Sequence, residues 1–198
     1  MFPDLTRDDV FRIETRRLWL RWPCAKDADA VLRLAGDPAV AGTTVQIPHP
    51  LSRAEVDAFL LQARAGNAAG AGLTLALARR SAPGNLIGVV GLVGDAGVPE
   101  LGYWLGRPSW GGGLMGEAVA AVLDAYFAYA GGAAVTASAR ADNAAARRVL
   151  ERCGFVRAGT ETRAFPARGG AVTVDLFRLD RARWLGLAGI DPETAQAA

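Results

Sequence analysis

Hydrophobic and polar positions change period along the chain, and each change predicts an element of secondary structure. Alternation of apolar with other residues predicts strands over residues 17–22 and 73–77, and a further apolar run predicts a strand over residues 86–93. A helical period predicts a helix over residues 26–35, and its apolar face holds Ala28, Val31, Leu32 and Ala35.

A second helix is predicted to start at Ser52, because Ser52 and Glu55 have the spacing of a capping box. Its apolar positions include Val56, Phe59 and Leu60. Glycine, proline and asparagine predict turns, with one irregular stretch between the two helices. The turns are expected at residues 36–38, 66–72 and 81–85, and the irregular stretch at residues 41–50.

A strand over residues 100–105 completes a predicted meander of three strands joined by turns. The later elements are expected to be a helix over 114–130, a strand over 133–139, a helix over 143–152, strands over 155–158 and 171–177 joined by a long loop, and one helical turn over 180–184. This order predicts an α/β (α+β) fold with a mixed sheet. We expect one domain over residues 1–198, with its core at about 14–185, a loose lead-in and a frayed tail.

Composition excludes several classes of protein. With 198 residues, 51% of them hydrophobic, the chain is too apolar to be disordered. Its net charge of +2 gives no overall basic field, so we expect no nucleic-acid partner. The acidic N-terminal segment is not a signal peptide. Because Glu117 and Asp124 interrupt the most apolar helix, we expect a core helix and no membrane partner.

Cys24 and Cys153 are the only cysteines, and no group of His and Cys residues has zinc spacing. We therefore expect reduced thiols, a cytoplasmic protein and no metal. Cys153, next to Gly154 and Phe155, is interpreted as a small buried apolar residue.

The most informative stretch is ELGYWLGRPSWGGGLMGE, residues 100–117. Its pattern predicts a strand, a connector in which Pro108 ends that strand, a triple-glycine loop at residues 111–113, and a helix. The first amides of a helix have no carbonyl partner within it, and the helix dipole favours negative charge there. Glycines let a ligand approach these amides closely, so the stretch predicts a phosphate or pyrophosphate site.

Two classes of ligand fit such a loop. Gly111, Gly113 and Gly116 match the G-x-G-x-x-G fingerprint of dinucleotide sites. The context argues against a dinucleotide, because the connector at residues 108–110 separates strand from loop and several strands come earlier. An acidic ribose ligand about twenty residues on is also missing, since residues 135–137 are Val, Thr and Ala.

The segment Trp110–Ala118 resembles the acetyl-CoA loop of the GNAT superfamily of N-acetyltransferases, whose pattern is Arg/Gln-x-x-Gly-x-Gly/Ala. It is most similar to the RimJ/RimL-like branch, which acetylates protein N-termini and other amines. Met115 departs from the family's Gly or Ala, so its side chain must point away from the ligand. The resemblance implies that acetyl-CoA is a cosubstrate bound by Gly111, Gly112, Gly113, Leu114, Met115 and Gly116.

Two further segments carry the same resemblance. Residues 14–21, with Asp27-Ala28 after them, are similar to the branch's opening strand. Residues 142–155 match the family segment Asn-x-x-Ser-x-Arg/Lys-Val-Leu-Glu-Lys-x-Gly-Phe, in which Asn143 caps a helix, holds the pantetheine arm of the cosubstrate, or does both. Ala146 stands where that branch often has a serine, a candidate proton donor to the departing thiolate. Donation would then come from water or another residue, or the thiolate would leave unprotonated.

The resemblance also implies which residues surround the reacting groups. In the family, the strand before the loop splays from its neighbour and offers free backbone groups to pantetheine, and Tyr103, Trp104 and Leu105 map onto that strand. Glu100 matches a position where the family often carries a glutamate base for the acceptor amine. The alternative for Glu100 is a solvated carboxylate at the start of a strand.

Two other ionisable residues have competing interpretations. Glu117 is the alternative to Glu100 as the catalytic carboxylate, but it lies in the first helical turn, where stabilisation by the helix dipole explains its presence. In the family, the first two helices line the acceptor side, so His49 between them is either a substrate contact or base, or a surface histidine held between two prolines.

The resemblance therefore implies a GNAT-like, mostly antiparallel sheet of about seven strands flanked by about four helices. It implies an acetyl-CoA-dependent N-acetyltransferase whose partners are acetyl-CoA and an amine acceptor, either a small molecule or a protein N-terminus, and a monomer or homodimer. A catalytically weak acyl-CoA sensor or scaffold of the same fold is the alternative, which the departures at Met115 and Ala146 support.

Overall fold

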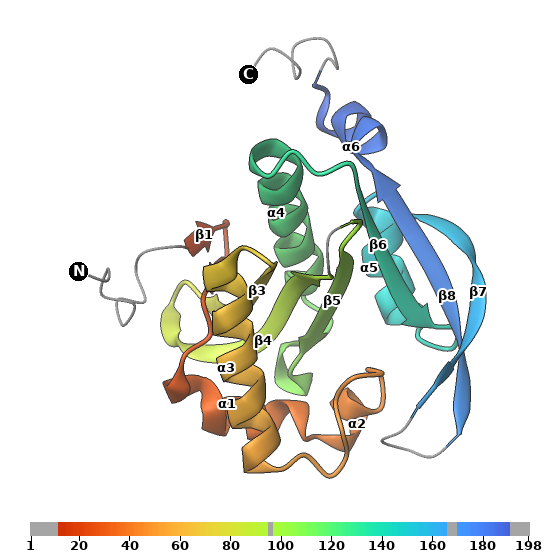
Figure 1. Ribbon diagram of the computed structural model, residues 1–198. Helices are drawn as coiled ribbons and strands as arrows, with labels where there is room; N and C mark the ends of the chain where they lie inside the picture. Colours follow the sequence, from red (N-terminus) through yellow and green to blue (C-terminus); the bar gives the residue numbers. More distant parts are fainter. Residues whose placement is uncertain (1–11, 95–96, 166–169, 191–198) are drawn as a thin grey trace.

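Eight strands form one sheet in the computed structural model, which describes residues 12–94, 97–165 and 170–190 (Figure 1). The strands are β1 (Arg12–Glu14), β2 (Leu18–Arg21), β3 (Gly72–Arg79), β4 (Ala82–Val93), β5 (Glu100–Leu105), β6 (Ala134–Arg140), β7 (Val156–Ala164) and β8 (Ala171–Asp180). Their order across the sheet is β1-β2-β3-β4-β5-β6-β8-β7. All neighbouring pairs are antiparallel except β5 and β6, which are parallel.

Six α-helices accompany the sheet in the described residues: α1 (Ala28–Ala35), α2 (Pro38–Ala41), α3 (Arg53–Ala69), α4 (Leu114–Tyr129), α5 (Ala144–Arg152) and α6 (Arg181–Ala188). Two short 3-10 helices, η1 (Ala25–Asp27) and η2 (Arg107–Ser109), precede α1 and the glycine loop. This mixed arrangement confirms the predicted fold class, with one strand and two helices more than expected. Within the described residues, no helix combines the length and hydrophobicity that a membrane span requires.

Most predicted elements form, but several boundaries differ. The predicted turn at residues 66–72 is helical up to Ala69, because the Asn67 side chain exchanges two hydrogen bonds with the backbone of Thr74. Gly70, at φ +67°, then ends the helix. In the predicted break around residues 36–38, Asp37 accepts a hydrogen bond from the Ala39 amide and starts α2.

Four further differences come from contacts between elements. Residues 12–14 of the expected lead-in form β1, in which Arg12 stacks on the ring of Trp19. β4 begins at Ala82, inside the predicted turn, and β7 extends to residue 164 because it pairs with β8 along its length. The final helix has two turns rather than one, since Trp184 stacks on Phe127 of α4. The expectations for residues 1–11, 95–96, 166–169 and 191–198 lie outside the described residues.

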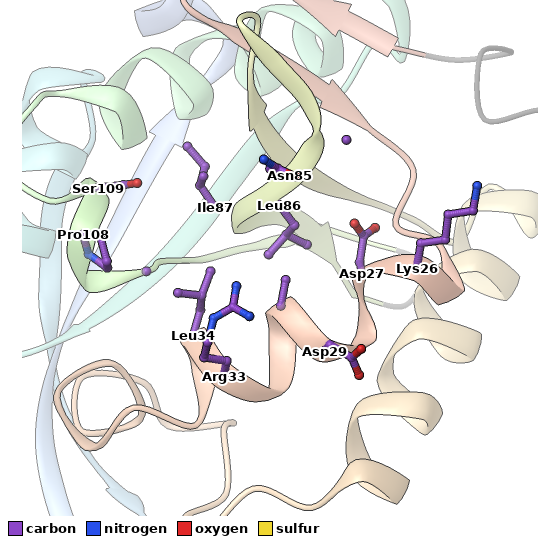
Figure 2. Close-up of a pocket in the computed structure, with 13 residues that line it drawn as sticks. Lys26, Asp27, Asp29, Arg33, Leu34, Asn85, Leu86, Ile87, Pro108 and Ser109 are labelled. Carbon is purple, nitrogen blue, oxygen red and sulfur yellow. The ribbon is translucent and has the colours of Figure 1, made fainter.

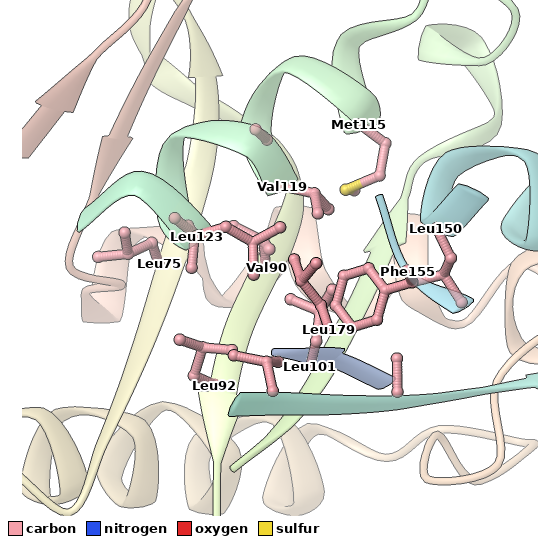
Figure 3. Packing of buried hydrophobic residues seen from close by; sticks show 14 of the residues in the cluster. Leu75, Val90, Leu92, Leu101, Met115, Val119, Leu123, Leu150, Phe155 and Leu179 are labelled. Carbon is pink, nitrogen blue, oxygen red and sulfur yellow. The ribbon is translucent and has the colours of Figure 1, made fainter. Parts of the chain in front are cut away.

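The two faces of the sheet carry separate apolar clusters. One joins α1 and α3 to β3 and β4, through residues that include Val31, Val56 and Val89. The other lies between the opposite face and α4, and Figure 3 shows Val119 and Leu123 of α4 packed over Val90 and Leu101 of the sheet. Alternate residues of β5 serve the two faces, so one strand contributes to both layers.

A buried ion pair ties β2 to the start of α1. Asp27 accepts two hydrogen bonds from the Arg21 guanidinium, at 2.7 and 2.8 Å, and one from the Cys24 amide. The Asp27 side chain is 1% exposed, whereas that of Asp29 is 85% exposed and pairs with Arg53 on the surface. Both aspartates line a pocket of about 460 Å³ beside α1 (Figure 2).

We predict that Asp27→Ala lowers the free energy of unfolding by about 3 kcal/mol, because removing one partner leaves a buried charge unpaired. Asp29→Ala is the matched control and should change it by less than about 0.5 kcal/mol, since its ion pair is solvated. Urea unfolding of both variants measures the difference. Equal effects of the two substitutions would contradict the structural role of the Arg21–Asp27 pair.

Candidate active site

A cleft opens where β5 and β6 part. The two strands pair only through Glu100 with Thr136 and Leu101 with Ala137, and they then diverge, as Figure 1 shows. The cleft has a volume of about 1430 Å³. Its walls come from α4 and α5 on one side and from α1, α3 and residues 43–51 on the other.

The glycine loop borders this cleft and ends at the N-terminus of α4. Gly111 and Gly113 have φ values of +77° and +68°, a region that favours glycine. The Glu117 amide donates to the Gly113 carbonyl and makes the first bond of the helix, so the amides of residues 113–116 precede it. No side chain among the described residues caps this helix end. An anion is therefore the group that these amides are arranged to bind.

Glu117 anchors the loop to the start of β2. Its carboxylate accepts hydrogen bonds from the Thr15 hydroxyl at 2.5 Å, the Arg17 amide at 2.8 Å and Arg17 Nε at 2.6 Å. Arg17 Nη1 also donates to the Gly112 carbonyl at 2.7 Å. Burial raises the pKa of the Glu117 carboxyl, but the hydrogen bonds from Thr15 and Arg17 and the Arg17 charge outweigh it, so the pKa is lowered. Glu117 and its hydrogen bonds to Thr15 and Arg17, here called the Glu117 brace, thus hold the loop in place.

β5 presents one bare edge to the cleft. Residues 102–105 pair with β4 on one side and have no β6 partner on the other. The Trp110 indole donates to the Leu105 carbonyl at 2.6 Å, which closes the turn into the loop. The Tyr103 hydroxyl donates to the Ala146 carbonyl at 3.0 Å and links β5 to α5 across the opening. Burial raises the pKa of Tyr103 and keeps the phenol protonated.

Glu100 lies at the point where β5 and β6 separate. Its Oε1 accepts hydrogen bonds from the Ser138 hydroxyl at 2.6 Å and from Arg163 Nη1 at 3.0 Å. Arg163 reaches Glu100 from β7 and also pairs with Glu161. Sequence reasoning missed Ser138 and Arg163, because neither lies in a motif and Arg163 is remote in the chain. Oε2 of Glu100 has no hydrogen-bond partner within the described part of the chain.

Comparisons with known proteins decide the family. The model of an acetyltransferase (GNAT) domain matches residues 17–156, which is more than two thirds of the chain. The chain belongs to the GNAT acetyltransferase family. A comparison with curated protein sequences gave no significant match.

Solved structures of other acetyltransferases share this fold. RimL, a ribosomal L7/L12 α-N-protein acetyltransferase in complex with coenzyme A, has a TM-score of 0.74 and 18% identity over 86% of this chain and 98% of that chain. A ribosomal-protein-S5-alanine acetyltransferase from Vibrio fischeri has a TM-score of 0.76 and 18% identity, covering 88% and 98%. At 18% identity, both likenesses show that the fold is shared.

A spermidine N-acetyltransferase from Vibrio cholerae, in complex with CoA and spermine, is about as similar. Its TM-score is 0.73 and its identity 19%, over 86% of this chain and 99% of that chain. The names of these three proteins specify different acceptors. At such identities the likeness establishes the fold and leaves the acceptor of this acetyltransferase open.

The acetyltransferase loop tolerates Met115 for a simple reason. The Met115 side chain is 6% exposed and lies in the core beside Val119 and Phe155 (Figure 3), so only its backbone faces the loop. Most predicted site residues line the cleft: Glu100, Tyr103, Trp104, Leu105, Gly111, Gly113, Leu114, Met115, Gly116 and Asn143. Gly112 does not line it, and its carbonyl is bound by Arg17.

Asn143, His49 and Cys153 have different positions relative to the cleft. Asn143 Oδ1 accepts from the Ala146 amide at 3.0 Å and caps α5, while its side-chain amide group has no partner in the described residues. His49 is exposed and does not line the cleft. Cys153 lines the cleft, and burial and the negative charge of Asp124 raise the pKa of its thiol to about 11, so the thiol stays protonated near neutral pH.

In the described part of the chain, no group of three or more His, Cys, Asp or Glu side chains is placed to hold a metal ion.

Gly116→Glu tests whether the loop binds an anion, and it does so with little backbone strain. Gly116 is helical, and a Cβ there meets no atom within 4 Å, unlike Gly113, whose positive φ would strain any substitution. We predict that Gly116→Glu keeps the fold and weakens acetyl-CoA binding at least about tenfold, because it places a carboxylate at the anion site. The measurement is the stabilisation of the folded state by acetyl-CoA, which amounts to about 2.7 kcal/mol at 100 times Kd.

Gly66→Glu in α3 is the matched control, because Gly66 is also helical with open space at its Cβ and lies outside the cleft. It should bind acetyl-CoA as the wild type does. Full binding by Gly116→Glu would remove the helix N-terminus from the site.

The Glu117 brace predicts a pH dependence of stability. Because the pKa of Glu117 is lowered from 4.5 on folding, the carboxylate contributes stability above that pH, and this contribution is lost as pH falls through the lowered pKa. The difference in free energy of unfolding between wild type and Glu117→Gln should therefore shrink between pH 6 and pH 3. Glu151→Gln, at an exposed glutamate of α5, is the control for loss of a surface carboxylate. A pH-independent Glu117→Gln effect would argue against the brace.

Proposed function

We propose that this chain is an acetyl-CoA-dependent N-acetyltransferase that acts on a primary amine by direct attack. The observation that carries the proposal is the pairing of two features on one cleft: an uncapped helix N-terminus beside a glycine loop, and the Glu100 carboxylate where β5 and β6 part. The first feature is suited to pyrophosphate, and the second to an amine.

Residues of the loop and of β5 would hold the cosubstrate. The amides of residues 113–116 offer donors to the pyrophosphate, and the free edge of residues 102–105 offers backbone groups to the pantetheine amides. The side-chain amide of Asn143, which lines the same cleft, would add a further hydrogen bond from the other side. When bound, acetyl-CoA supplies an acetyl group activated as a thioester.

Glu100 would receive the proton of the acceptor amine. Ser138 and Arg163 hold Oε1, so the carboxylate is fixed in position and Oε2 is left to accept a hydrogen bond, directly or through one water. An N-terminal amine, with a reference pKa near 8, needs less help from such a base than a lysine amine near 10.4.

The structure weakens the case for an acyl-CoA sensor without turnover. That alternative rests on Met115 and Ala146, which depart from the family pattern. Met115 keeps its amide at the loop and buries its side chain. Tyr103 brings a protonated hydroxyl to the carbonyl of Ala146, where the branch often has a serine. A hydroxyl group is therefore present near that position, with its hydrogen bonded to the Ala146 carbonyl.

Glu100→Gln should lower kcat by about 100-fold near neutral pH, the scale of a lost general base, and leave acetyl-CoA binding unchanged. CoA release in the presence of amine measures turnover, and thermal stabilisation by acetyl-CoA measures binding. Glu161→Gln is the matched control, because Glu161 also pairs with Arg163 but does not line the cleft. Turnover by Glu100→Gln at the wild-type rate would remove Glu100 as the base.

A further inference from the structure

The acceptor side of the cleft contains a pit with two glycines in its floor. Thr74, Gly91 and Gly102 lie opposite one another on β3, β4 and β5 and form one row across the sheet. All three line the cleft. A Cβ at Gly102 would meet no atom within 4 Å, whereas one at Gly91 would approach Thr74 Oγ1 to 3.1 Å. The row therefore leaves a hollow in the sheet surface.

Two rows of larger side chains flank this hollow. On one side Val89 lies opposite Trp104, and on the other Val93 lies opposite Glu100. Residues two apart on a strand point to the same face about 7 Å apart, so Glu100, Gly102 and Trp104 share one face of β5. An amine beside Glu100 therefore projects its substituent over Gly102 toward the Trp104 side chain.

The roof of the pit is also largely apolar. It is formed by Phe59 and Gln62 of α3 and by residues of the connector before that helix, namely Val45, Ile47 and Leu51. Arg140 donates to the Gly42 carbonyl at 2.7 Å and ties this connector to β6.

The charges that line the cleft disfavour a polycationic acceptor. Glu55 and Glu100 are its only carboxylates in the described residues. Glu100 pairs with Arg163, and Glu55, which is hydrogen-bonded to Ser52, lies in the first turn of α3, where the helix dipole stabilises its charge. Arg140 and Arg163 add positive charge at the β6 side. A second ammonium group close to Glu100 would lie near these two arginines and against apolar walls, which is unfavourable.

We infer that the acceptor is a primary amine with a single positive charge that carries an apolar or aromatic group next to the amine, and that this group binds over Gly102 between Glu100 and Trp104. The inference rests on the proposed function and specifies its acceptor class. Both a free aralkylamine and the N-terminal residue of a peptide present this chemistry.

The first test measures kcat/KM for ethylamine, butylamine, hexylamine, 2-phenylethylamine and spermidine at saturating acetyl-CoA. We expect roughly a fourfold rise for each added methylene that the pit buries, and a value for spermidine below that for butylamine. A flat series, or preference for spermidine, would overturn the acceptor class and leave the proposed function standing. Acetyl-CoA binding without CoA release for any amine would overturn the proposed function and this inference with it.

The same assay separates the two sources of the apolar amine. One arm uses 2-phenylethylamine, and the other uses two tripeptide amides that differ only in an N-terminal phenylalanine or glycine. A large preference for the phenylalanine peptide over both other substrates indicates a protein N-terminus, and preference for 2-phenylethylamine indicates a small-molecule acceptor. A preference for the glycine peptide counts against the pit.

Gly102→Val fills the floor and should reduce kcat/KM for hexylamine and 2-phenylethylamine at least about tenfold more than kcat/KM for ethylamine. This ratio reports on the acceptor alone, because weaker acetyl-CoA binding would affect all three amines equally. Gly84→Val is the matched control, because Gly84 also lies in a strand with an open Cβ position and is outside the cleft. Phe59→Ala, with exposed Leu61→Ala as its control on α3, is the second variant should Gly102→Val fail to fold. An unchanged chain-length dependence in either folded variant would refute the pit.

Discussion

The parting of β5 from β6 after two residue pairs is the constraint on which the site depends. A parallel pair that continued would bury both strand edges in hydrogen bonds and close the cleft. Because the strands diverge, β5 keeps one edge free from residue 102 onward, and its end leads directly into the glycine loop. The free edge, the loop amides and Glu100 therefore all open on one continuous space.

The backbone groups that lose a strand partner where β5 and β6 part need other hydrogen bonds, because unpaired polar groups are costly to bury. Side chains on both sides of the opening make such hydrogen bonds. Trp110 holds the Leu105 carbonyl, Tyr103 bridges to α5, and Arg17 holds the Gly112 carbonyl while it pairs with Glu117. The loop can therefore keep its amides available for a ligand without losing its own geometry.

The face of β5 that carries Glu100 has a separate role from the face that packs on α4. Leu101 belongs to the core beneath α4, whereas Gly102 and Trp104 face α1 and α3. In the proposed function, the edge of this strand faces the cosubstrate and one of its faces is turned toward the acceptor. Cosubstrate and acceptor would then reach the opening from different sides, as direct transfer between them requires.

The sequence by itself determined the features that depend on residues within about four positions of one another. The Ser52 cap, the Asn143 cap, the strand at residues 100–105 and the left-handed glycines of the loop are of this kind, because capping bonds and backbone preferences are local. These features also carried the family resemblance, which is why the loop and the strand that begins at Glu100 could be predicted.

Only the tertiary structure decided which distant groups meet. Arg163 and Ser138 reach Glu100 from β7 and β6, and Thr15 and Arg17 reach Glu117 across about a hundred residues of chain. The floor of the pit exists because strand register sets glycines opposite each other, and α3 extends past its predicted end because it packs on β3. Register and packing arise from the folded sheet as a whole, so no local pattern in the sequence encodes them.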